Sequence, residues 1–102
     1  MKVSKTGEFG LIQKLARQIN KSTDRRWKSW RELVVSIGDD AAVWNTYSPF
    51  QIVTTDSLVE GVHFSFKTAT WRELGWKSIA VNLSDIAAMG GIPTYALVSL
   101  GL

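Results

Sequence analysis

Two stretches of the 102-residue chain carry hydrophobic side chains at helical spacing. Between Phe9 and Ile19 the apolar residues recur every three or four positions, which predicts an amphipathic helix. A second helix should open at Thr70, because Thr70 and Glu73 form the Thr-x-x-Glu pattern of a capping box. It should run for about 18 to 20 residues, until Gly90 ends it.

Shorter apolar stretches fit β-strands instead. The segments 33–37 and 41–44 flank a pair of aspartates, and 50–56 follows a turn signal, so two or three strands are expected there. The segment 61–66 alternates apolar and polar residues as a half-buried strand does, which places His63 on the face opposite its phenylalanines.

The remaining stretches predict a loop and a last strand. Segment 20–32 mixes polar, basic and tryptophan residues with neither period, which favours a loop. The apolar tail 94–102 predicts a strand with no closing turn after it, so we expect the chain to be the front part of a longer protein. The order helix, strands, helix, strand favours an α+β fold with a mixed or antiparallel sheet packed against helices.

Composition limits the possible classes of protein. With 45% hydrophobic and 21% charged residues, the chain suits one small globular domain with a modest core. The sequence contains no long apolar run and no secretory signal, so we expect a cytoplasmic protein without a membrane partner. The absence of cysteine excludes disulfides and thiolate metal sites, so a metal would need oxygen ligands or His63.

Charge is distributed unevenly along the chain. The net charge is +3, yet residues 1–32 carry nine Lys/Arg and three Asp/Glu, while residues 33–102 carry three and six. The basic segment 21–31 contains Trp27 and Trp30, which fits either stacking on nucleic acid or a basic loop whose tryptophans cover the core. We favour the loop, because no nucleic-acid motif accompanies the charge.

Acidic residues stand beside hydroxyl or amide residues at three places: the pair 39–40, Asp56 and Asp85. Carboxylates that gather without cations repel one another, and a divalent ion removes that cost. Oxygen ligands of this kind are typical of magnesium sites. Ser78, Asn82 and Asp85 share one face of the second predicted helix, which fits either a lined pocket or a solvent-facing edge.

Several nucleotide and metal motifs are absent from the sequence. It contains no GxxxxGK[ST] loop, no GxGxxG turn and no HExxH helix. Phosphate would therefore have to be handled mainly through metal ions. Considered alone, the single His63 is more typical of a structural residue than of a ligand contact.

Four motifs occur together in the order seen in one family: "GEFGLI", "IGDDAAV", "TTDSLVEGVHF" and "GWKSIAVNLSDIAAMGGIP". In this combination the chain resembles the front part of thiamine-monophosphate kinases, which belong to the aminoimidazole ribonucleotide synthetase-like superfamily. The resemblance covers nearly the whole chain, with 21–31 the least similar part. It implies that residues 1–102 form the N-terminal, ATP- and magnesium-binding domain of that fold, incomplete and without its C-terminal domain.

The resemblance also implies a reaction of thiamine biosynthesis, in which ATP phosphorylates thiamine monophosphate to thiamine diphosphate with the help of Mg²⁺. It implies a homodimer, and it identifies neither a catalytic acid or base nor the ATP-binding residues. His63 resembles a contact to thiamine monophosphate, whereas Asp39 has no clear ligand role and a structural hydrogen bond is as compatible with the pattern. The residues that resemble metal ligands are Asp40, Thr54, Thr55, Asp56 and Asp85.

Because members of the family continue well past this length, the chain alone is expected to be inactive. Two alternative functions stay open. The same carboxylate scaffold would also suit another ATP-dependent superfamily member, such as a synthetase that acts on a different acceptor. A non-catalytic assembly module is the alternative from a different class.

Overall fold

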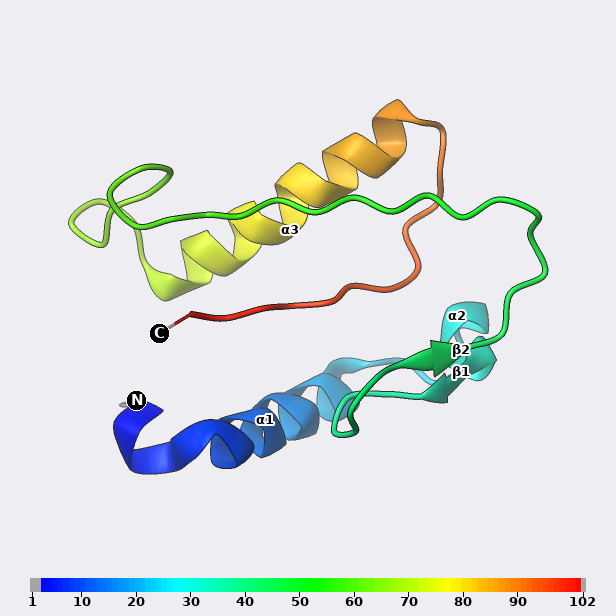
Figure 1. Cartoon of the computed structure of the whole chain (residues 1–102), viewed down its shortest axis with the longest axis horizontal. Helices are drawn as coiled ribbons and strands as arrows, with labels where there is room; N and C mark the ends of the chain where they lie inside the picture. The colour runs from blue at the N-terminus through cyan, green and yellow to red at the C-terminus, as the bar shows by residue number, and fades with distance from the viewer. Residues whose placement is uncertain (1–2, 102) are drawn as a thin grey trace. The chain divides into compact units, whose positions relative to one another are not determined.

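The computed structural model describes residues 3–101. Its elements in chain order are α1 (Val3–Ser22), α2 (Lys28–Glu32), β1 (Leu33–Val35), β2 (Val43–Trp44) and α3 (Trp71–Ala88) (Figure 1). The described residues form two compact units. Unit 1 contains those up to Tyr47 and from Tyr95 onward, and unit 2 is Ser48–Thr94. The combination of helices with a small antiparallel sheet is consistent with the α+β class.

Helix α1 contains the predicted helix and extends beyond it at both ends. Gly7 interrupts it with φ 71° and ψ 169°, a conformation that glycine adopts without steric cost. Beyond this kink, Leu11, Ile12 and Ala16 are half-buried, whereas Phe9 is 79% exposed. The apolar face is therefore covered only in part.

The segment 20–32, predicted as a loop, is largely helical. Its first residues complete α1, and α2 occupies Lys28–Glu32. Lys28 Nζ lies 3.6 Å from the Glu32 carboxylate one turn later, the spacing of a helical ion pair. The prediction was wrong because a helix of five residues is too short to show a hydrophobic period.

The two strands that flank the aspartate pair are confirmed. Strands β1 and β2 pair antiparallel, with Leu33 opposite Trp44 and Val35 opposite Val43. The register is irregular between these two pairs. The hairpin therefore places residues 36–42 in a loop that projects from the end of the strand pair.

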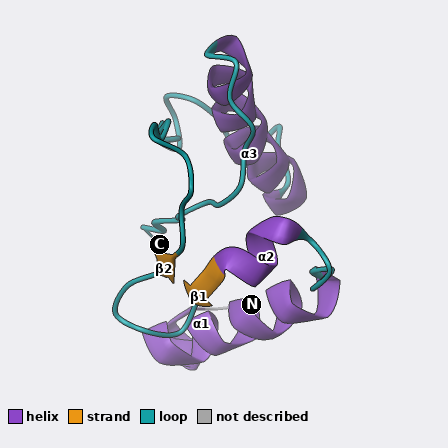
Figure 2. Cartoon of the chain, turned by 90° about the vertical axis from the view of Figure 1, so that its right-hand side faces the viewer, coloured by secondary structure: helices purple, strands orange, loops and turns teal. Residues whose placement is uncertain are grey.

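The other strands predicted from the sequence are absent from the described residues. Among the described residues, Figure 2 shows strands only at β1 and β2. Residues 50–56 and 94–101 form no strand. Residues 61–66 form turns instead of the half-buried strand. A strand needs a neighbouring strand with which to exchange hydrogen bonds, and the alternation of apolar residues does not supply one. Leu102, the last residue of the predicted tail strand, lies outside the described residues.

Helix α3 is confirmed with its predicted cap. The Thr70 hydroxyl accepts a hydrogen bond from the Glu73 backbone N–H, at 3.2 Å, before the helix begins at Trp71. The helix ends at Ala88, and Gly90 follows with φ 73°, the left-handed conformation that commonly terminates helices.

The expected core is not formed by the described residues, none of which is fully buried. Trp71 and Trp76 on α3 are 64% and 74% exposed. Much of the apolar surface of the described residues therefore stays in contact with water.

None of the helices within residues 3–101 has both the length and the apolar character needed to cross a membrane.

Candidate functional site

In unit 2 the segment that follows Ser48 runs along α3 in the opposite direction (Figure 1). Its start lies against the C-terminal end of the helix, where a Cβ placed on Gly91 would come within 2.8 Å of Ile52 Cδ1. The glycine therefore permits this close approach. Farther along, Thr54 reaches Asp85, and His63 reaches Lys77 nearer the start of the helix.

Thr54 and Asp85 are the two predicted metal ligands that the structure brings together. Thr54 Oγ1 donates a hydrogen bond to Asp85 Oδ2 at 3.4 Å, across 31 residues of sequence. This distance is long for a hydroxyl-to-carboxylate bond, so the contact by itself is weak. It nevertheless places two oxygen donors from separate motifs beside each other.

Thr55 and Asp56 follow Thr54 on the same segment and are exposed. Asp85 is exposed as well, so its carboxylate is in contact with water. Between residues 3 and 101, no group of three or more His, Asp or Glu side chains lies in a position to hold a metal ion. The metal-binding roles of Thr55 and Asp56 therefore stay predictions.

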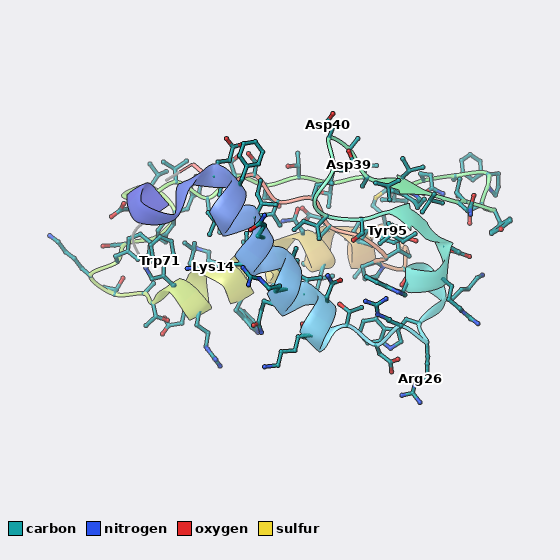
Figure 3. The ribbon with its side chains drawn as sticks, turned by 90° about the horizontal axis from the view of Figure 1, so that it is seen from below. Lys14, Arg26, Asp39, Asp40, Trp71 and Tyr95 are labelled. Atoms are coloured by element: carbon teal, nitrogen blue, oxygen red, sulfur yellow. The ribbon has the colours of Figure 1, made fainter. Side chains whose placement is uncertain are left out.

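The aspartate pair occupies the loop between β1 and β2, where both side chains are exposed (Figure 3). Asp39 Oδ1 accepts a hydrogen bond from the Asp40 backbone N–H at 2.8 Å, and Gly38 has φ 113°. Both carboxylates are accessible to water, so neither suffers a desolvation penalty. Asp39 thus has a structural hydrogen bond.

Asp40 belongs to unit 1, whereas Asp56 and Asp85 belong to unit 2. The convergence of these three carboxylates on shared cations stays a prediction. So does the role of Asp40 as a metal ligand.

His63 lies in a hydrogen-bonded turn, which replaces the predicted strand. The Val59 N–H donates to His63 Nδ1 at 2.9 Å, and the His63 N–H donates to the Val59 carbonyl at 2.9 Å. Gly61, with φ 81°, donates its N–H to the Phe64 carbonyl at 2.8 Å. These bonds fix both the backbone of the turn and the orientation of the imidazole ring.

Two sets of contacts join this turn to α3. Lys77 Nζ donates to the His63 carbonyl at 2.7 Å. The rings of Phe64 and Phe66 meet edge to face at 5.2 Å, and Phe66 contacts Trp71 at 4.4 Å. The two phenylalanines therefore pack together as the alternation predicted, although by way of a turn. Lys77 was not predicted, because a lysine on an exposed helix carries no sequence signal of a distant partner.

Ser78, Asn82 and Asp85 form a polar stripe on α3. Backbone carbonyls of the helix itself accept the hydrogen bonds that Ser78 and Asn82 donate. Ser78 Oγ donates to the Gly75 carbonyl at 2.8 Å, and Asn82 Nδ2 donates to the Ser78 carbonyl at 2.7 Å. Asn82 Oδ1 is shielded from water and has no hydrogen-bond partner in the described part of the chain. Asn82 is therefore the member of the stripe that would gain most from a ligand that donates a hydrogen bond to it.

In the basic segment 21–31, part of the charge is engaged internally. Arg26 pairs with Asp24 at 2.9 Å, and Arg25 lies over the Trp30 ring at 5.2 Å from its centroid. The side-chain hydrogen bond from Arg26, aided by its backbone N–H, lowers the pKa of Asp24. Trp27 is 59% exposed, so it does not cover a core as the loop interpretation suggested.

Comparisons with known proteins agree with the motifs. Residues 38–102 match the family described as AIR synthase related protein, N-terminal domain. The chain is 51% identical over 69 residues to a thiamine-monophosphate kinase of Bacillus subtilis (67% of this chain, 21% of the relative). It is 38% identical over 102 residues to one of Aquifex aeolicus (100% and 29%), and 37% identical over 97 residues to one of Haemophilus influenzae (94% and 27%).

The resemblance inferred from the motifs is thereby confirmed. The chain spans less than a third of the length of these relatives. No solved structure matches it with significant similarity.

Proposed function

The chain belongs to the AIR synthase related protein family, N-terminal domain, and from this premise we propose that it forms part of an ATP-dependent thiamine-monophosphate kinase. The curated relatives reported above bear that name. The observation that carries the proposal is the contact between Thr54 and Asp85, which joins the "TTDS" and "NLSD" motifs. Both motifs supply oxygen donors, which suits an enzyme that handles phosphate through cations.

The donor set fits magnesium. Neighbouring ligands of an octahedral Mg²⁺ lie about 3.0 Å apart, given metal–oxygen distances near 2.1 Å. Thr54 Oγ1 and Asp85 Oδ2 are 3.4 Å apart, so a movement of about 0.4 Å would bring them to that spacing. When bound, the ion neutralises phosphate charge. The residues of unit 2 that would hold it are Thr54, Thr55, Asp56 and Asp85. Asp40 of unit 1 is proposed separately as a metal ligand.

The acceptor phosphate of thiamine monophosphate is already a nucleophile, so the chain's residues need not supply a general base. Their task is to align the two phosphates and to keep the acceptor in place. His63 is assigned to orienting the substrate. A cytoplasmic homodimer belongs to the same proposal, and so does the inactivity of this chain alone.

The test is a chimeric enzyme. The chain aligns over all 102 residues with the Aquifex aeolicus kinase, so it can replace the matched region of that relative. The chimera should form thiamine diphosphate from ATP and thiamine monophosphate. A folded chimera that used an aminoimidazole precursor instead would favour a different superfamily member, and one that used neither would contradict the proposal.

His63→Ala in the same chimera should raise KM for thiamine monophosphate and leave KM for ATP unchanged. An unchanged KM for thiamine monophosphate would remove His63 from the substrate site.

The assembly-module alternative is favoured by one observation, the large exposure of apolar side chains such as Phe9, Trp71 and Trp76. Calorimetric titration of the chain with Mg²⁺ separates the two proposals. The kinase proposal expects binding that is lost in Asp85→Asn, whereas an assembly module has no reason to show such binding.

A further inference from the structure

We propose that Lys77 is a positioning residue, which holds the turn 59–64 so that His63 presents Nε2–H as a hydrogen-bond donor. The ligand it serves would offer an oxygen acceptor, such as a phosphate or carbonyl oxygen. The identity of that ligand as thiamine monophosphate rests on the proposed function. The inference about Lys77 and the imidazole rests on contacts within unit 2.

The protonation of the ring follows from its partner. A backbone N–H can only donate, so the bond from Val59 N–H requires a lone pair on His63 Nδ1. The neutral imidazole then carries its proton on Nε2. His63 is exposed, so this N–H is accessible to a ligand. A proton on Nδ1 would remove the bond and release the ring.

The orientation of the ring depends on the turn, and the turn depends on Lys77. Val59 and His63 are joined twice, through the ring and through the backbone. The ammonium of Lys77 binds the carbonyl of the same His63 at 2.7 Å and so attaches the turn to α3. A hydrogen bond from a charged donor is stronger than a neutral one, which suits this role.

The ring cluster of Phe64, Phe66 and Trp71 supports the same arrangement. Phe64 contacts Phe66, and Phe66 contacts Trp71 in the first turn of α3. His63 is therefore followed at once by a residue that packs toward the helix. With Lys77 removed, the ring cluster would keep the turn near α3 while the His63 carbonyl lost its attachment.

The first test is a spectroscopic one on the chain itself. Because the chain contains one histidine, a long-range ¹H–¹⁵N spectrum of the labelled chain shows a single imidazole. At a pH well above the usual histidine pKa, we expect a lone-pair Nδ1 and a protonated Nε2. Lys77→Met should shift the signals toward the average of the two tautomers. A proton on Nδ1, or averaged signals in the unsubstituted chain, would overturn the proposal.

Two matched variants control this measurement. Lys77→Arg keeps a charged donor and should restore the tautomer signals. Arg72→Met removes a charge from the same helix at an exposed position and should leave them unchanged. Equal signals in Lys77→Met and in the unsubstituted chain would show that Lys77 does not hold the ring.

The second test uses the chimeric enzyme. Lys77→Met should raise KM for thiamine monophosphate about threefold to tenfold with little change in kcat, because misplaced binding groups weaken substrate positioning. Lys77→Arg should recover most of that loss. If the chimera is active and Lys77→Met has no effect on KM, the positioning role is wrong. If the chimera is inactive, the proposed function fails while the tautomer measurement still decides the role of Lys77.

Discussion

The contacts within unit 1 differ in kind from the contacts within unit 2. Unit 1 contains the strand pair β1–β2. Tyr95, in the last segment of this unit, donates its hydroxyl to the Ser29 carbonyl at 2.5 Å. Its ring contacts Trp44 of β2 at 5.0 Å. Unit 2 has no strand among its described residues and depends on side-chain contacts that tie loops to α3.

The chemistry follows the same division. Nine of the twelve Lys/Arg lie in unit 1, whereas five of the six predicted site residues lie in unit 2. Those five are Thr54, Thr55, Asp56, His63 and Asp85. The site is thus assigned mainly to the unit with few backbone pairings, where a single side chain can determine the local arrangement.

Asp85→Asn in the chimeric enzyme should lower kcat at least about a hundredfold, because it removes charge from the centre of the proposed site. Steady-state formation of thiamine diphosphate measures this. Glu73→Gln, which neutralises an exposed carboxylate in the first turn of α3 in the same unit, is the control and should be close to the unsubstituted chimera. Retained activity in Asp85→Asn would break the assignment of the site to unit 2. A loss of the same size in Asp40→Asn would show that unit 1 contributes equally.

Thr70→Ala should destabilise the first turn of α3 by about 1 kcal/mol, because the Glu73 N–H loses its acceptor. Amide hydrogen exchange over the first turn of α3 measures the effect. Thr70→Ser retains the hydroxyl and should behave like the unsubstituted chain. Faster exchange in β1 and β2 as well would contradict the separation of the two units.

Tyr95→Phe should destabilise unit 1 by about 0.5 to 1 kcal/mol, because it removes the bond to the Ser29 carbonyl. Burial, followed by the charge of Glu32, raises the pKa of Tyr95 above 10.0. The protonated phenol is thus favoured in the folded chain, so its contribution is complete below pH 10 and is lost as the pH rises through the raised pKa.

Urea unfolding at neutral and alkaline pH measures both effects. The difference between the unsubstituted chain and Tyr95→Phe should shrink above pH 10. A difference that stayed constant would show that the hydroxyl does not provide the contact.

The smallest effect is expected at the Asp24–Arg26 pair. Asp24 should titrate below 3.8, and Arg26→Gln should return its midpoint toward that value, because the side-chain bond from Arg26 is the main cause of the lowered pKa. Any stabilisation is present above this pH range and is lost as the pH falls through it. The pair is exposed, so the urea midpoint at neutral pH should not change measurably. An unaltered Asp24 titration in Arg26→Gln would show that the pair is not formed in solution.

The sequence predicted those features that depend on local chemistry. The cap at Thr70, the helix that follows it, and the strands on both sides of the aspartate pair all arise from neighbouring residues. The predictions of strands at 50–56 and 61–66 were wrong, because a strand also needs a partner strand elsewhere in the chain. The alternation of apolar and polar residues in 61–66 indicates only which side chains lie on the same side of the segment. Phe64 and Phe66 do lie on the same side, since their rings contact each other.

Within the candidate site, the motifs identified the two residues that meet, Thr54 and Asp85, but not the contact between Lys77 and His63. A long-range bond between a side chain and a backbone carbonyl has no sequence signature. The structural bond of Asp39 is local, yet the pattern left it undecided, because an aspartate beside another aspartate is equally compatible with metal binding.

The exposed tryptophans of α3 make this chain suitable for optical study. Indole rings that face water, such as Trp71 and Trp76, emit at longer wavelengths than rings in an apolar environment. Any association that covers the helix should therefore shift the intrinsic fluorescence to shorter wavelengths. The shift would report the association without a label, at concentrations well below those that calorimetry requires.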